Sequence, residues 1–165
     1  MTKKDILKIY SEFKVPKHII AHMQKVAYVC EFLASGMIKK GFKIDVKSLL
    51  EAASLHDVLR LVDCHEKKMA RVMRKKGEKK IADLIAKHGF FSIWKLKTWE
   101  EKILYYADKR VDHDKIVNLK KRFEEGKKRN FTSEDDMEFV TKTEKEVEKL
   151  EKEFAGILGQ TIYSL

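Results

Sequence analysis

The chain has 165 residues, of which 44% are hydrophobic and 38% are charged, and these values are typical of one globular domain. They exclude a disordered chain, and we expect no membrane span because no apolar run approaches the roughly 20 residues that one needs. The net charge of +10 favours anionic partners, either small phosphorylated molecules or nucleic acid, or it simply keeps the protein soluble. Because Cys30 and Cys64 are isolated and no signal peptide is recognisable, we expect a cytoplasmic protein.

The first half of the chain is predicted to be helical. One proline and seven glycines leave room for long helices, which makes an all-α fold the default. Pro16 suits the first turn of a helix, and Asp45 is a candidate N-cap. Gly77 and Gly89 are expected to end the helices before them. The apolar periodicity places these helices at about residues 4–13, 16–40, 46–58, 64–75 and 78–88.

The second half is predicted to be helical as well. Thr98 and Glu101 have the spacing of a capping box, which predicts that a helix begins there. The basic residues 120–129 are expected to form a loop or a frayed helix end. Apolar residues near heptad spacing predict a last helix at about residues 133–158, beginning at Thr132 or Ser133. This helix packs on its own domain or mediates a dimer, and the oligomeric state stays open.

Several histidines and aspartates fall on or beside helix faces that should lie inside, namely His22, His56, Asp57, His88 and Asp108. Each has an ordinary explanation by itself, such as a hydrogen-bonded core histidine, a buried salt-bridge partner or a histidine at a helix C-terminus. Jointly they favour a shared role, because unpaired buried imidazoles and carboxylates are costly. A divalent metal would satisfy them together, since it binds neutral imidazoles and neutralises carboxylates.

The order His, His-Asp, Asp, with the doublet at the end of a small apolar helix, resembles the HD superfamily of metal-dependent phosphohydrolases. The resemblance extends over roughly residues 15–125 and includes the segments VPKHIIAHMQKVAYVCEFLA, LLEAASLHDVLRL and WEEKILYYADKRVDHDKIVNLKKRF. Many members read His-Asp-Ile-Gly at the doublet, whereas Val58 and Leu59 follow it here, which affects the expected turn and pocket floor. We therefore expect one HD-type domain over residues 1–165, an all-α, compact bundle of about six to seven helices.

The resemblance implies that His22, His56, Asp57 and Asp108 surround one metal ion. Several subfamilies add histidines that hold a second metal, which the aspartate of the doublet bridges. His88 is a candidate for that second site or for a contact with a substrate phosphate, and His65 is either a second-site ligand or a surface histidine. His18 and His113 are expected to face solvent. Manganese, iron, cobalt, nickel, zinc and magnesium all suit such a mixed nitrogen and oxygen site.

The resemblance also implies hydrolysis of phosphate mono- or diesters by metal-activated hydroxide, and we expect the substrate to be a small phosphorylated molecule, a nucleotide in particular. Asp57 would ligate the metal and orient the attacking water. Arg60 and Lys109 are candidates for binding the phosphate charge, although both also fit a plain basic surface. Four aromatic residues either stack a base or, as we favour, belong to the core: Phe90, Phe91, Trp94 and Trp99.

Two alternatives remain. In the first, residues 120–129 and the nearby aromatics bind nucleic acid and the HD site is vestigial, which an intact ligand set disfavours. In the second, the protein is an HD-fold di-iron oxygenase, which requires that both His65 and His88 be ligands.

Overall fold

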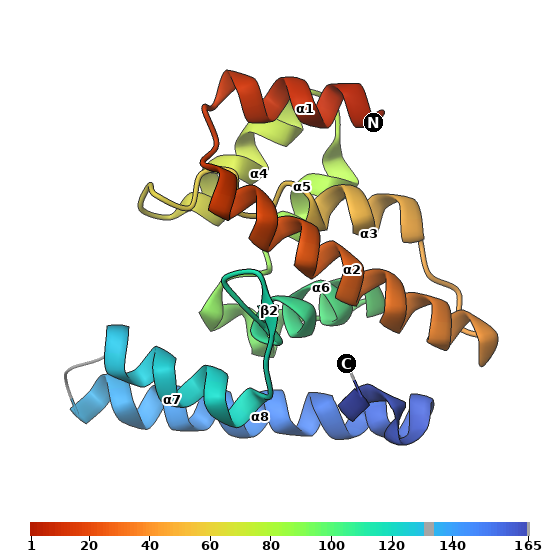
Figure 1. The fold of residues 1–165 in the computed structure, drawn as a ribbon, viewed down its shortest axis with the longest axis vertical. Helices are drawn as coiled ribbons and strands as arrows, with labels where there is room; N and C mark the ends of the chain where they lie inside the picture. Colours follow the sequence, from red (N-terminus) through yellow and green to blue (C-terminus); the bar gives the residue numbers. More distant parts are fainter. Residues whose placement is uncertain (131–133, 165) are drawn as a thin grey trace.

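The computed structural model describes residues 1–130 and 134–164, and it is built almost entirely of packed helices (Figure 1). The α-helices in chain order are α1 (Lys3–Glu12), α2 (Lys17–Lys39), α3 (Val46–Ala53), α4 (His65–Lys75), α5 (Lys79–Ile85), α6 (Trp99–Lys109), α7 (Leu119–Asn130) and α8 (Glu134–Leu158). Two 3-10 helices, η1 (Phe90–Lys95) and η2 (Gly159–Ser164), and a hairpin of β1 (Val111–Asp112) and β2 (Lys115–Ile116) complete the described elements. The all-α prediction is confirmed. None of the described helices is both long and apolar enough to cross a bilayer.

Helix α2 is the central element of the fold. Its apolar stripe is fully buried at Met23, Val26, Cys30, Leu33 and Met37, as the 3.6-residue periodicity predicts. It contacts α3, α6 and α8 (Figure 1), so these elements share one hydrophobic core. Because α2 also contacts β1 and β2, it connects the core to the hairpin that follows α6.

Several predicted helix ends are confirmed. Thr98 and Glu101 form a reciprocal capping box at the start of α6, and the Asp45 side chain accepts a hydrogen bond from the Ser48 N–H at the start of α3. Gly41 and Gly77 have positive φ angles of 90° and 84° just after α2 and α4, a conformation that a side chain would disfavour.

Two helices end earlier than predicted, and side chains are the reason. Helix α3 ends at Ala53, so the His-Asp doublet lies in a run of turns and not on a helix. The His56 ring donates from Nδ1 to the Ala53 carbonyl at 2.8 Å, and the Tyr10 hydroxyl donates to the Ser54 carbonyl at 2.6 Å. These bonds occupy the carbonyls that a longer helix would use.

A hydrogen bond from a side chain to a backbone carbonyl also ends α5. The His88 ring donates from Nδ1 to the Ile85 carbonyl at 2.7 Å, and the helix stops at Ile85 and not at residue 88. The prediction that Gly89 ends this helix is wrong, because its φ angle of −58° is not left-handed.

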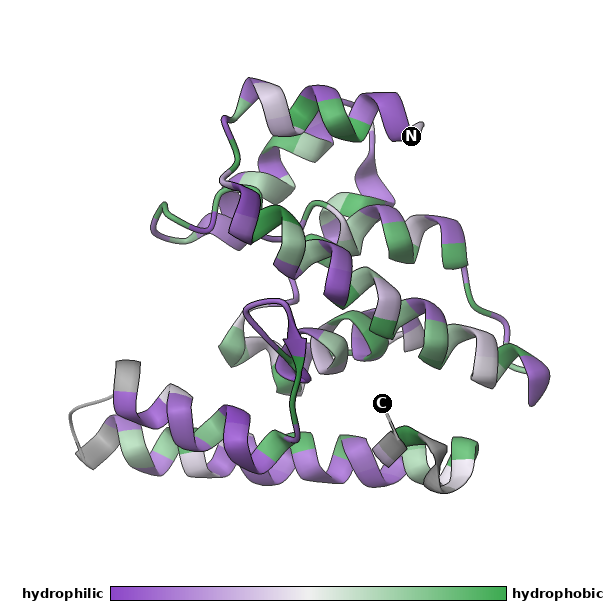
Figure 2. Cartoon of the chain, in the orientation of Figure 1, coloured by the Kyte–Doolittle hydropathy of each residue, from purple (hydrophilic) through white to green (hydrophobic). Residues whose placement is uncertain are grey.

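The segment 120–129, predicted to be a loop or a frayed end, is the helix α7. It is hydrophilic along most of its length (Figure 2), and only Leu119 and Phe123, one turn apart, are deeply buried among its described side chains. So narrow an apolar stripe is a weak sequence signal. Packing against α8, which lies beside it in Figure 1, stabilises the helix.

Helix α8 packs on its own chain. Val140, Val147, Leu150 and Phe154 are buried, which confirms the intramolecular interpretation of the apolar stripe. The predicted starting positions Thr132 and Ser133 lie outside the described residues, and the described helix begins at Glu134.

Replacing Asp45 by alanine is expected to destabilise the protein by about 1 kcal/mol at neutral pH, because the α3 N-cap is lost. Lys80 and Ser48 lower the pKa of Asp45 to about 2 in the folded protein, below its unfolded value of about 3.9. The difference in unfolding free energy is therefore full above pH ~4 and disappears as the pH falls through about 2. Urea denaturation of both proteins across this range checks it, with Asp63→Ala, at an exposed aspartate, as the control.

Candidate metal centre

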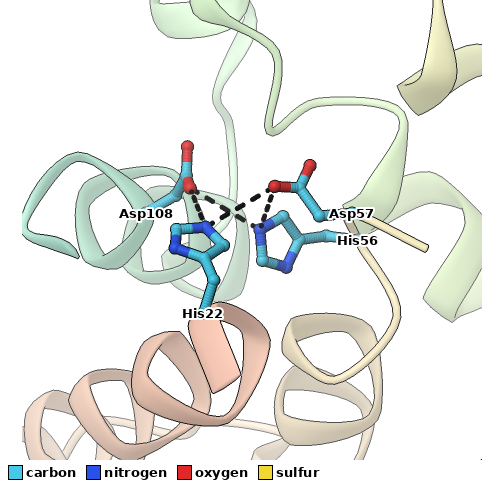
Figure 3. Close-up of side chains that lie close together, drawn as sticks. All are labelled: His22, His56, Asp57 and Asp108. Atoms are coloured by element: carbon cyan, nitrogen blue, oxygen red, sulfur yellow. Dashed lines mark hydrogen bonds and ion pairs between the residues drawn. The ribbon is translucent and has the colours of Figure 1, made fainter. Parts of the chain in front are cut away.

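Four side chains that are far apart in the sequence converge in the interior. His22 comes from α2, His56 and Asp57 from the turns after α3, and Asp108 from the last turn of α6. All of them are buried, and their functional groups point toward one another (Figure 3). We call these residues the first cluster. The structure therefore brings together the set that the sequence predicted.

The spacing within the first cluster suits a metal ion. His22 Nε2 lies 3.1 Å from Asp108 Oδ1 and 3.5 Å from Asp57 Oδ2. His56 Nε2 lies 3.6 Å from Asp57 Oδ2 and 3.5 Å from Asp108 Oδ1. Ligands bonded at ~2.0–2.2 Å to one ion lie about 3.0–3.5 Å apart, so these separations fit a shared divalent cation.

The ring orientation also fits a metal. His22 Nδ1 lies 2.8 Å from the His113 carbonyl, and His56 Nδ1 lies 2.8 Å from the Ala53 carbonyl. Carbonyls accept only, so each Nδ1 carries the proton and each Nε2 presents a lone pair to the cluster. The buried His56 Nε2 has no hydrogen-bond partner among the described residues, which is costly unless something else binds it.

A second cluster shares the Asp57 carboxylate. Asp57 Oδ1 lies 3.0 Å from His65 Nε2 and 3.3 Å from His88 Nε2, and the two Nε2 atoms lie 3.1 Å apart. Asp57 thus directs Oδ2 to the first cluster and Oδ1 to the second, and both clusters have donor atoms within 4.8 Å of one another. The interpretation of His65 as a surface histidine is wrong, because its ring faces Asp57 and its side chain is only 26% exposed.

The family model for the HD domain matches residues 19–111, which is more than half of the chain and includes both clusters. The chain belongs to the HD domain family. Comparison with curated proteins and with solved structures found no match. The family resemblance identified from the sequence is thereby confirmed.

The two clusters together form what we call the HD site. Its electrostatics favour the protonation states that bind a cation. Burial by itself raises the pKa of Asp57 and Asp108. The neighbouring histidines and, at Asp108, the Lys109 ammonium outweigh burial and hold both pKa values well below the usual range. Burial lowers the pKa of His88, which favours its neutral form. Ionised carboxylates and neutral imidazoles are the protonation states of metal ligands.

His65 titrates differently from His88. Burial alone lowers its pKa, but the hydrogen bond to Asp57 and the charges of Asp57 and Glu66 outweigh burial and raise the pKa. His65 is the most exposed of the four site imidazoles. It therefore lies where the second cluster meets solvent.

The two predicted phosphate contacts both adjoin the HD site. Arg60 Nη1 donates to Asp57 Oδ2 at 2.5 Å, and Lys109 Nζ donates to Asp108 Oδ2 at 2.7 Å. The Arg60 side chain is 42% exposed, whereas that of Lys109 is 8% exposed, so Lys109 is not a plain surface residue. Both residues line an open cavity of about 300 Å³ together with His65 and Phe90.

The backbone contributes one feature that sequence reasoning missed. The His113 side chain is exposed, as predicted, but its carbonyl orients His22 from the β1–β2 turn, where His113 has a φ of 54°. Arg110, which is buried, stabilises this hairpin through a bond from Nε to the Val117 carbonyl at 2.8 Å. A carbonyl that orients a ligand carries no side-chain signal, so nothing in the sequence could have identified it.

The aromatic residues divide between several environments. Trp99 is half-buried and stacks near Phe154, as a core residue does. Phe91 and Trp94 are exposed and contact Phe139 of α8, so the prediction that they belong to the core is wrong. The reason is that η1 packs on α8 at the surface of the bundle.

Adding a divalent metal to chelator-treated protein is expected to raise the melting temperature by about 5–10 °C at 100 times the dissociation constant, since only the folded state holds the clusters. The Asp108→Asn variant, which keeps the size but loses the charge, is expected to lose most of this shift. The control Asp114→Asn, at an exposed residue, is expected to keep it. A metal-induced shift that Asp108→Asn does not reduce would contradict the role of the first cluster.

Proposed function

We propose that this HD protein is a metal-dependent phosphohydrolase that cleaves phosphate mono- or diesters, with nucleotides as the substrate class. The observation that carries the proposal is the Asp57 carboxylate shared between two buried clusters beside a cation-lined cavity. In this proposal, one divalent ion is held by the first cluster, His22, His56, Asp57 and Asp108. A second ion is held by Asp57, His65 and His88. Manganese, iron, cobalt, nickel, zinc and magnesium remain the candidate ions.

When bound, such ions lower the pKa of water and withdraw electron density from a phosphoryl oxygen. The protein positions the reactants: the carboxylates of Asp57 and Asp108 accept hydrogen bonds from the attacking water and fix its direction of approach. The water oxygen bonds to phosphorus, the ester P–O bond breaks, and a proton from water is transferred to the leaving oxygen. Lys109 holds the Asp108 carboxylate in place, and Arg60 pairs with that of Asp57 until substrate binds.

Arg60 is the better candidate for the phosphate contact. Negative charge increases on the non-bridging phosphate oxygens in the transition state, and a guanidinium can bind two of them at once. Arg60 is half-exposed and lines the cavity, so its side chain can move from Asp57 to a substrate. Lys109 is buried against Asp108, which suits a residue that neutralises and orients that carboxylate.

Nucleotides suit the cavity because it combines cations with aromatic surface. Phe90 and Phe123 line it and lie 6.1 Å apart between ring centroids, and apolar surface of this kind can contact a base. The cytoplasmic location stays a prediction, with Cys30 buried and Cys64 exposed as free thiols.

One observation favours the oxygenase alternative. An oxygenase requires His65 and His88 as ligands, and both histidines lie in the second cluster. We nevertheless favour hydrolysis, because the adjoining cavity is lined by cations, which suits a phosphate ester. Turnover that depends on oxygen and on reducible iron would instead support the oxygenase.

The nucleic-acid alternative depends on the basic segment that forms α7. Part of its charge, at Arg122 and Lys127, lines the cavity and does not lie on the outer surface. Steeply salt-dependent binding of single-stranded nucleic acid, without hydrolysis of any phosphate ester, would support this alternative.

The first experiment is elemental analysis of the purified protein and of Asp57→Ala, together with hydrolysis of p-nitrophenyl phosphate across added metals. Wild type is expected to hold one or two metal equivalents and to turn over, and the variant to lose both properties, because Asp57 belongs to both clusters. Absence of any divalent metal from wild type under all conditions would overturn the proposal.

Replacing Arg60 by glutamine separates binding of metal from binding of phosphate. The variant is expected to keep its metal equivalents and to lose about 10²–10³ in kcat/KM, the usual effect of removing one donor to developing charge. Lys68→Gln, an equal change of charge at an exposed position on α4, is the control and should keep full activity. An undiminished kcat/KM in Arg60→Gln would remove Arg60 from the reaction.

A further inference from the structure

Helix α7 forms one wall of the cavity beside the HD site, and the proposed reaction makes no use of its charges. Arg122, Phe123, Gly126 and Lys127 line the cavity from α7, and Val140 lines it from α8. Arg60 and Lys109 line the same cavity from the HD site. The cavity is therefore continuous from the metal ligands to α7.

The cavity is strongly cationic. Four of its lining residues, Arg60, Lys109, Arg122 and Lys127, carry positive charge, and no carboxylate lines it within the part of the chain that is described. Like charges held around one cavity repel one another and favour the binding of an anion. A single phosphate next to the clusters would neutralise only the charges of Arg60 and Lys109.

Arg122 is a buried donor with spare capacity. Its side chain is 17% exposed, its Nη1 lies 3.8 Å from Asp112 Oδ1, and its buried Nε has no hydrogen-bond partner among residues 1–130 and 134–164. A buried N–H without an acceptor is costly. An anion in the cavity would give the guanidinium a closer partner than Asp112.

Lys127 has an acidic partner that a ligand can replace. Its Nζ donates to Glu144 Oε2 of α8 at 2.5 Å, and its side chain is 24% exposed. Asp112 and Glu144, the ion-pair partners of Arg122 and Lys127, belong to neither cluster of the HD site. These two cations are thus independent of the metal ligands, unlike Arg60 and Lys109.

The remaining lining is apolar. Phe123 and Val140 are almost fully buried, and the Phe90 ring contacts Phe123 at 59°. Phe123 and the two cations line the same wall of the cavity, since all three come from α7. A ligand with a ring and more than one phosphate group matches that combination.

We propose that Arg122 and Lys127 form a second anion site, which binds a phosphate group other than the one that is hydrolysed. The inference rests on the proposed function for the reacting phosphate, and it narrows the substrate to nucleotides that carry at least two phosphate groups. Arg122 donates to it in a charge-assisted hydrogen bond from its guanidinium, and Lys127 exchanges Glu144 for the phosphate.

The test compares adenosine ligands with one and two phosphate groups, namely AMP, ADP and adenosine 3′,5′-bisphosphate, by calorimetry on chelator-treated protein. Wild type is expected to bind ADP or the bisphosphate at least about tenfold more tightly than AMP. Arg122→Gln/Lys127→Gln is expected to lose about 10- to 100-fold in affinity for the two-phosphate ligand, as charge-assisted bonds are removed. The preference of this variant for the two-phosphate ligand over AMP should fall by the same factor.

Two further variants make the result specific. Lys121→Gln/Lys128→Gln makes the same change of charge at exposed positions on α7 and should keep the wild-type preference. Glu144→Gln removes the carboxylate that competes for Lys127 and should strengthen binding of the two-phosphate ligand several-fold. If the first double variant does not fold, as circular dichroism would show, Lys127→Gln and Glu144→Gln still give opposite predictions.

Equal affinity of wild type for AMP and for both two-phosphate ligands would overturn the inference, as would an unchanged preference in the folded α7 variant. Because the calorimetry needs neither metal nor turnover, it separates the two proposals. If wild type hydrolyses phosphate esters but does not prefer two-phosphate ligands over AMP, only the second anion site is contradicted. Absence of hydrolysis with the preference intact would remove only the proposed function.

Discussion

The Asp57 carboxylate is the group on which the rest of the site depends. Its two oxygens lie within 3.6 Å of four imidazoles that come from α2, from the turns after α3, from the start of α4 and from the segment after α5. A buried carboxylate is tolerated only where partners compensate its charge, so these elements must meet at one point. The positions of the helices and of the ligands are therefore set by the same group.

Two of these histidines, His56 and His88, also end the helices that precede them. His56 and His88 each donate from Nδ1 to the carbonyl of a residue three positions earlier, at the last residues of α3 and α5. One hydrogen bond thus stops the helix, satisfies a free carbonyl and leaves Nε2 with a lone pair directed at the cluster. Local structure and ligand chemistry are consequently inseparable at these two positions.

The layer formed by α7 and α8 completes the cavity beside the HD site. The residues of the two clusters lie on α2, on α6 and on the turns and helices between them. The far wall of the cavity comes from α7 and from Val140 of α8. Arg122 and Lys127 of α7 thereby line the cavity and do not lie on a solvated face. In the proposed second anion site, α7 would set the substrate preference without changing the residues of the two clusters.

The sequence by itself determined the fold class, the principal helices and the first cluster, because apolar periodicity and the order of His22, His56, Asp57 and Asp108 are patterns that can be recognised along the chain. It left His65 undecided, predicted a loop or a frayed helix end for residues 120–129 and extended two helices too far. Distant contacts contribute to these outcomes: the Tyr10 hydroxyl on the Ser54 carbonyl at the end of α3, the His88 ring beside His65, and α8 against α7. Only tertiary structure decided them, since such partners are brought together by folding and leave no periodic trace in the chain.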